Sequence, residues 1–216
     1  MNKIGKMIIG VVAVAAVVGG CLLFLNKGVG TKSNDITFGG QSVVLQNGDK
    51  TLNLDLPKAD QLADSPGAVM GFLNLTEEQE TQRREQEERM MQASENGEEF
   101  NEEMIDDTVS GENYDAIKNQ SINQISINLK NDISARYEIS NVVYERDTLE
   151  SIAEGVKDAK FGDHDFMYTV QTQDDYRFYY MVCNELDGNS IFVVLTAKTD
   201  LSEDTLVQYM SAIQFK

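Results

Sequence analysis

Metal binding is the first chemistry that the residue types of this chain suggest, because its single histidine stands between two aspartates. The run Asp163-His164-Asp165 contains three side chains that can each ligate a metal ion. Consecutive residues of an extended chain point to opposite faces, so one ion would rarely contact all three. We therefore interpret this run as a solvated turn and predict no metal site.

The two cysteines, Cys21 and Cys183, leave little scope for sulfur chemistry. Cys21 stands in an apolar N-terminal segment, so Cys183 is the single cysteine in the remainder of the chain. One cysteine supports neither an intrachain disulfide nor a zinc site built from paired cysteines. We interpret Cys183 as a small strand residue, with intermolecular disulfide pairing as the alternative.

The sequence contains none of the common catalytic signatures. A Ser-His-Asp or Cys-His arrangement would have to use His164, and no nucleophile elbow surrounds a serine. No phosphate-binding loop and no glycine-rich dinucleotide motif is present. We predict that the protein is not an enzyme, with no catalytic and no cofactor-binding residues and no cofactor. A hydrolase that uses two of the many carboxylates is the enzymatic alternative.

The charge of the chain excludes several classes of partner. Thirty-six aspartates and glutamates oppose 18 lysines and arginines, which gives a formal net charge of -18. Such a charge repels the phosphates of nucleic acids and anionic lipid headgroups. The chain also has no basic stripe of the kind that nucleic-acid surfaces need. We expect a protein partner and no nucleic acid.

The N-terminal residues predict a membrane anchor. Residues 7–25 carry no charge and are almost entirely apolar, and about 19 residues suffice for a helix to cross a ~30 Å hydrocarbon layer. Positive charge is retained on the cytoplasmic side of a bacterial membrane, and Lys3 and Lys6 precede the segment. The prediction is a cytoplasmic n-region (1–6), a transmembrane signal-anchor helix (7–25), a linker (26–35) and an extracytoplasmic domain (36–216).

Four residues within this segment suggest an alternative, in which the N-terminal segment is cleaved off. The run Val18-Gly19-Gly20-Cys21 resembles the lipobox of bacterial lipoproteins, which implies cleavage before Cys21 and lipidation of its thiol. A cleaved signal peptide turns small and polar at its end, whereas residues 22–25 are Leu-Leu-Phe-Leu. That run favours the uncleaved anchor. The alternative is a lipoprotein that binds a small ligand or cation for a transporter or sensor.

Strand patterns dominate the remaining residues. Residues 42–46 and 51–56 flank Asn47-Gly48, a strong hairpin signal. Three more strand-like runs, 165–173, 176–185 and 190–198, are separated by short turns and predict an antiparallel meander. The second and third runs are apolar on both sides, which predicts a sheet that is covered on both faces. We expect helices on one face, and residues 66–75, the acidic segment or a partner on the other.

Helices are predicted in three places. Residues 148–160 place apolar side chains on one face, and Ser202 can cap a final helix over residues 203–213. The acidic segment 76–107 opens with Thr76 as a helix cap, and acidic and basic residues follow at four-residue spacing. It predicts a solvated helix followed by a flexible acidic loop, with a partner-binding arm or a weak divalent-cation surface as the alternatives.

This order of elements resembles a known family. A strand ending in Leu56-Pro57-Lys58, a late helix, three antiparallel strands and a last helix ending in Ile213-Gln214-Phe215 resemble the PsbP-like α/β/α domain. The resemblance implies an α+β fold, an antiparallel sheet with helices packed on it that ends strand-strand-strand-helix. It also implies a mostly non-enzymatic, accessory or scaffold role and assigns no site residues. We predict a membrane-anchored protein-interaction domain.

Overall fold

The computed structural model describes residues 36–215, which form an 11-stranded sheet and three α-helices. The order across the sheet is β11-β2-β1-β5-β6-β10-β9-β8-β7, and β3 pairs with both β4 and β5. The strands are β1 (Phe38–Asn47), β2 (Lys50–Pro57), β3 (Val69–Leu73), β4 (Thr108–Gly111), β5 (Ile122–Asn128), β6 (Ser134–Ser140), β7 (Lys157–Phe161), β8 (His164–Gln173), β9 (Tyr176–Leu186), β10 (Asn189–Ala197) and β11 (Ile213–Gln214). The helices are α2 (Glu77–Asn96), α3 (Arg146–Ile152) and α4 (Glu203–Met210).

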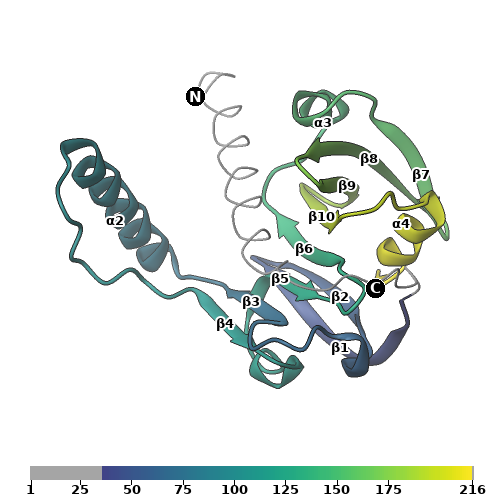
Figure 1. Cartoon of the computed structure of the whole chain (residues 1–216), viewed down its shortest axis with the longest axis horizontal. Coiled ribbons are helices and arrows are strands. Elements are labelled where there is room, and N and C mark those ends of the chain that lie inside the picture. The colour runs from purple at the N-terminus through teal and green to yellow at the C-terminus, as the bar shows by residue number, and fades with distance from the viewer. Residues whose placement is uncertain (1–35, 216) are drawn as a thin grey trace.

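The sheet curls around α4, which lies inside the curl (Figure 1). The main core fills this concave side and combines apolar side chains of β1, β2, β5 and β6 with those of the meander. From α4, Leu206, Tyr209 and Met210 join this core. The hydroxyl of Tyr137 on β6 donates a 3.1 Å hydrogen bond to the backbone carbonyl of Tyr209, which fixes the helix against the sheet.

A second, smaller core covers the convex side of the meander. It contains alternate side chains of β9 and β10, covered by Leu149 of α3 and by Tyr144, whose ring stacks on Phe192 with centroids 4.8 Å apart. The prediction that the second and third strands of the meander are apolar on both faces is therefore confirmed. The prediction that both late helices cover one face is wrong, because α3 and α4 join cores on opposite sides of the sheet.

The predicted fold class, an antiparallel sheet with helices packed on it, needs correction. The sheet is mixed, because β1 runs parallel to β5 where Leu45 pairs with Ile122. It also curls strongly, so a single helix fills its concave side, while α2 extends away from the body (Figure 1). The longest helix among residues 36–215 thus covers neither face of the sheet.

The membrane prediction also needs correction. Within residues 36–215, no helix combines the length and the apolar character that crossing a membrane requires, so the transmembrane and signal-anchor prediction has no counterpart there. The only long helix of that range, α2, is rich in charged residues. The predicted n-region (1–6), span (7–25), linker (26–35) and lipidation site at Cys21 all lie outside the described residues.

Most local element predictions agree with the structure, but two helix predictions need correction. The last helix, predicted over residues 203–213, ends at Met210, because Ile213 and Gln214 pair with β2 as β11. The hairpin, the three meander strands and the caps at Thr76 and Ser202 are present. The helix predicted over 148–160 is wrong, because α3 ends at Ile152 and residues 157–161 form β7. Ala153, with an extended backbone (φ -156°, ψ 146°), ends the helix; Gly155 follows with φ +82°, and β7 then pairs along its whole length with β8.

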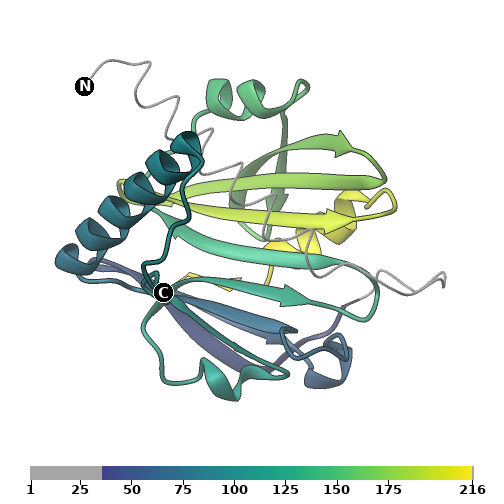
Figure 2. The ribbon, with the colours of Figure 1, turned by 60° about the vertical axis from the view of Figure 1, so that its left-hand side comes forward.

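Residues 76–107 form a projecting arm, seen beside one end of the strands in Figure 2. A capping box starts α2: Gln79 donates its backbone N–H to the Thr76 hydroxyl, and its side chain accepts from the Thr76 N–H. Gly97, with φ +69°, ends the helix, and residues 98–107 return along it to β4. The predicted flexible loop is therefore wrong, because this segment is hydrogen-bonded to the helix.

Candidate functional site

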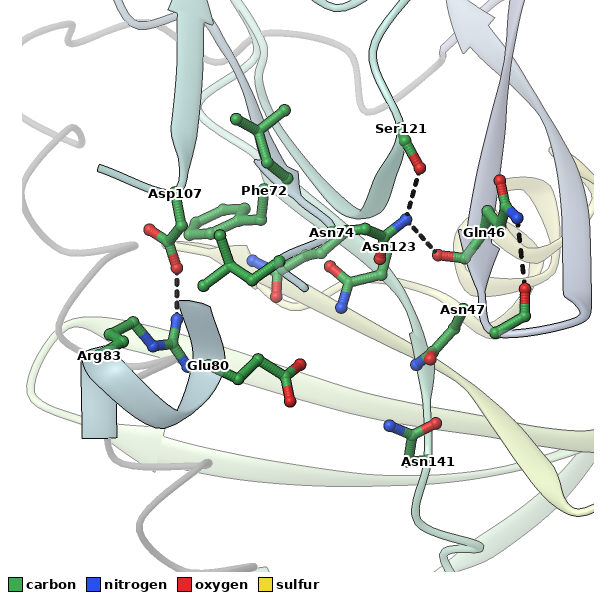
Figure 3. Close-up of a pocket in the computed structure, with 14 residues that line it drawn as sticks. Gln46, Asn47, Phe72, Asn74, Glu80, Arg83, Asp107, Ser121, Asn123 and Asn141 are labelled. Atoms are coloured by element: carbon green, nitrogen blue, oxygen red, sulfur yellow. Dashed lines mark hydrogen bonds and ion pairs between the residues drawn. The ribbon is translucent and has the colours of Figure 1, made fainter. Parts of the chain in front are cut away.

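A polar cleft of about 430 Å³ lies where the arm joins the sheet (Figure 3). Six amide side chains, a serine and three charged residues line it together with parts of the backbone and a few apolar groups. The lining residues are Gln46, Asn47, Gly48, Phe72, Leu73, Asn74, Leu75, Glu80, Arg83, Asp107, Ser121, Asn123, Gln124 and Asn141. They come from the β1–β2 turn, the end of β3, α2, the start of β4, the start of β5 and the segment after β6.

The β1–β2 turn forms one wall of the cleft. Gly48 adopts φ +60°, which the tight turn requires. The side chain of Asn47 donates a 2.8 Å hydrogen bond to the carbonyl of Ile139 on β6. This bond fixes the turn beside β6 and leaves the side-chain oxygen of Asn47 available to a ligand.

Asn74 joins three segments at the floor of the cleft. Its side-chain amide donates to the carbonyl of Gln46 and to the hydroxyl of Ser121, each at 2.9 Å (Figure 3). Its backbone N–H donates to the carbonyl of Ser121, also at 2.9 Å. These bonds hold the ends of β1 and β3 against the start of β5, so the floor is set before any ligand arrives.

The arm supplies the charged wall. Arg83 forms an ion pair with Asp107, and its Nε lies 3.6 Å from Glu87. Further along the helix, the side chain of Gln86 accepts from the N–H of Ile105 and donates to the carbonyl of Glu103. The helix and its return segment are thus connected by polar bonds, and the guanidinium of Arg83 is already neutralised.

Two polar side chains of the cleft have no bonding partner in the described part of the chain. Within residues 36–215, no hydrogen bond or ion pair engages the carboxylate of Glu80 or the side-chain amide of Asn123. In Figure 3 both extend into the same space, Glu80 from the arm and Asn123 from β5, with Asn47 and Asn141 opposite Glu80. The cleft therefore presents one free carboxylate beside several amide groups.

Behind the cleft, an ion pair on the convex face supports two of its lining residues. Arg136 of β6 donates to the side chains of Gln124 and Glu138, and its guanidinium lies 6.0 Å from the ring centroid of Phe72. Gln124 and Phe72 both line the cleft. Their positions are therefore fixed by contacts outside it, which favours a preformed site.

The structure gives His164 a different setting from the predicted solvated turn. It is the first residue of β8, its Nδ1 lies 2.5 Å from a carboxylate oxygen of Glu185, and its ring stacks on Phe215. Asp163 is exposed in the β7–β8 turn, and Asp165 pairs with Lys160. Across residues 36–215, no three His, Cys, Asp or Glu side chains converge on a point where a metal ion could bind.

Cys183 lies in the main core, in agreement with its interpretation as a strand residue. Burial raises the pKa of its thiol to about 11, so the thiol is protonated at neutral pH. A protonated, buried thiol is a poor nucleophile. Its position also gives a second protein molecule no access for intermolecular disulfide pairing.

The sequence analysis did not identify the cleft. Its residues are mostly asparagines and glutamines from six separate segments, and such residues are ordinary at strand ends. The signals that could have indicated it are the Asn47-Gly48 turn and the Thr76 cap, because both mark ends of elements that meet there. Comparison with known proteins adds no assignment: no family model, no curated protein and no solved structure matches this chain. The resemblance to the PsbP-like domain stays a prediction.

Proposed function

We propose that the protein is a non-enzymatic binding domain, with an accessory or scaffold role, that recognises a protein partner through the cleft between arm and sheet. The observation that supports the proposal is the concentration of amide side chains on a fixed floor, with Asn123 and Glu80 unpaired within residues 36–215. Asparagine and glutamine amides can donate to and accept from peptide backbone groups at once. An extended peptide segment supplies such groups at regular intervals.

The chemistry of the cleft supports binding more than catalysis. Its charged residues are Glu80 and the Arg83–Asp107 pair, and amide side chains make poor acids, bases and nucleophiles. Glu80 is the one carboxylate of the lining outside an ion pair, and no histidine, cysteine or lysine among the lining residues stands beside it to complete an acid–base pair. A hydrogen-bonding surface of fixed geometry serves recognition instead.

Selection from a peptide library tests this function. The full-length protein is incubated with a bead-displayed library of randomised octapeptides, and bound beads are sequenced. The Asn123→Leu variant removes the free amide from the cleft, and Asn119→Leu makes the same change at an exposed position outside it. We expect the wild type and Asn119→Leu to enrich a shared set of peptides that Asn123→Leu does not enrich. Equal enrichment by all three proteins would rule out the cleft as the binding site.

A small polar molecule is the second candidate ligand. The cleft volume of about 430 Å³ falls within the ~300–1,000 Å³ that is typical of small-molecule sites. A thermal-shift screen of neutral sugars and amino acids separates the two candidates, since a bound ligand stabilises the folded state. A shift that Asn123→Leu abolishes, with no peptide enriched, would favour the small molecule.

A further inference from the structure

We infer that the cleft accepts the cationic side chain of a lysine or arginine from an extended segment of the partner, with Glu80 as its counter-charge. This inference rests on the proposed function and specifies its partner. The structural basis is the combination of one uncompensated carboxylate and several amides in the same polar space. A basic side chain and its flanking peptide groups match these two kinds of group.

The net charge of the lining residues determines whether the cleft favours a cationic, a neutral or an anionic ligand. Arg83 is compensated by Asp107 within the cleft and by Glu87 beside it. Glu80 has no such compensation in the described part of the chain, so the lining carries a net negative charge. An anionic ligand would be repelled, and a neutral one would leave the carboxylate without a partner where it displaces water.

The neighbouring amides favour a cationic side chain that belongs to a peptide, because they can bind the backbone groups of that peptide. Glu80 approaches from the arm, whereas Asn47, Asn123 and Asn141 approach from the turn, β5 and the segment after β6 (Figure 3). The carboxylate and the amides therefore lie on different walls. A ligand that spans the cleft can place its cation at the arm and its peptide groups along the amides.

The charge of the whole chain acts in the same direction. A formal net charge of -18 produces a negative potential that attracts a cationic partner and accelerates its association. Long-range attraction of this kind is not specific by itself. The specificity of the cleft must come from the position of Glu80 relative to the amides.

Two charge-neutralising variants separate the effect of the Glu80 carboxylate from the effect of the net charge of the whole chain. Glu80→Gln removes the carboxylate from the cleft and keeps its shape. Glu78→Gln removes the same charge from an exposed position of α2 two residues earlier, which faces roughly the opposite side of the helix. Both positions are exposed, so neither variant threatens folding, and both full-length proteins carry one negative charge fewer.

The test uses octapeptides recovered from the library, resynthesised with each lysine replaced by norleucine and each arginine by citrulline. Isothermal titration at low salt should show that Glu80→Gln weakens binding of the parent peptides about fivefold, while Glu78→Gln changes it less than twofold. The neutral peptides should bind both variants and the wild type alike. Library peptides without enrichment in lysine or arginine, or an unchanged affinity for Glu80→Gln, would overturn this inference and leave the proposed function intact. An absence of any peptide that depends on Asn123 would overturn both.

Discussion

The ring of Phe215 stacks on the imidazole of His164, with centroids 4.1 Å apart and planes inclined by 23°. Phe215 directly follows β11, one edge of the sheet, whereas His164 opens β8, next to the opposite edge strand β7. The ring centroid of Phe161, at the end of β7, lies 6.1 Å from the ring centroid of Phe215. The two edges of the curled sheet are thus joined by aromatic contacts.

Loss of this contact should loosen both edges of the sheet. We expect Phe215→Ala to lower the free energy of unfolding by about 1–2 kcal/mol, because a half-buried ring loses apolar burial and stacking. Urea denaturation measures the loss, and hydrogen exchange should become faster in residues 157–161 and 213–214. Phe215→Leu keeps apolar contact and should lose less. Faster exchange spread evenly over the sheet would contradict a local role.

The attachment of the return segment to α2 should depend on Gln86. Its side chain accepts from the N–H of Ile105 and donates to Glu102 and Glu103. Gln86→Ala therefore removes the partner of the Ile105 N–H and of the Glu103 carbonyl, while Glu102 keeps its bonds to Arg89. We expect faster hydrogen exchange at Ile105 and its neighbours, with β9 unchanged. Gln82→Ala, an exposed glutamine of the same helix, is the matched control and should have no effect. Equal exchange in both variants would show that other contacts hold the segment.

The arm should also respond to acid. Hydrogen bonds from Gln86 and then Arg89 hold the pKa of the Glu102 carboxyl below its usual value of 4.5. A lowered pKa in the folded state means that the contact is fully stabilising above pH ~4.5 and is lost as the pH falls through the folded-state pKa. We expect hydrogen exchange, corrected for its intrinsic pH dependence, to show a looser return segment at pH 3 than at pH 6. Glu102→Gln should remove most of this difference, and a Glu102→Gln protein with the same acid response would contradict the assignment.

Cys183 should be unreactive in the folded protein. Its thiol is buried and its pKa is raised to about 11, so almost no thiolate is present at pH 8. In a Cys21→Ser protein, we expect an aromatic disulfide reagent to label Cys183 only after denaturant is added. Rapid labelling without denaturant would mean that the strand opens easily or that the thiol is accessible.

Gly71 on β3 should tolerate no side chain. A Cβ built at this position would lie 2.8 Å from the Cγ2 of Ile117 and 3.2 Å from that of Ile122. We expect Gly71→Ala to lower the free energy of unfolding by about 1–3 kcal/mol through overpacking. Gly40→Ala is the matched control, because nothing lies within 4 Å of its added Cβ. Equal stability of the two variants would show that β3 can shift away from Ile117.

The sequence by itself predicted the elements whose signals are local. The Asn47-Gly48 turn, the alternating strands of the meander and the caps at Thr76 and Ser202 depend on a few adjacent residues, and the structure contains each of them. Such signals act through backbone dihedrals and nearby hydrogen bonds. They therefore need no knowledge of distant segments.

Tertiary structure decided the features that depend on partners far away in the chain. Residues 148–160 have a helical pattern of apolar residues, yet pairing with β8 makes residues 157–161 a strand. Curling of the sheet placed α3 and α4 on opposite faces and brought Phe215 to His164. The cleft depends on the same long-range pairing, since Asn74 and Ser121, 47 residues apart, meet on its floor. Asparagines at strand ends acquire a binding role only when the sheet brings those ends together, and no local spacing encodes that arrangement.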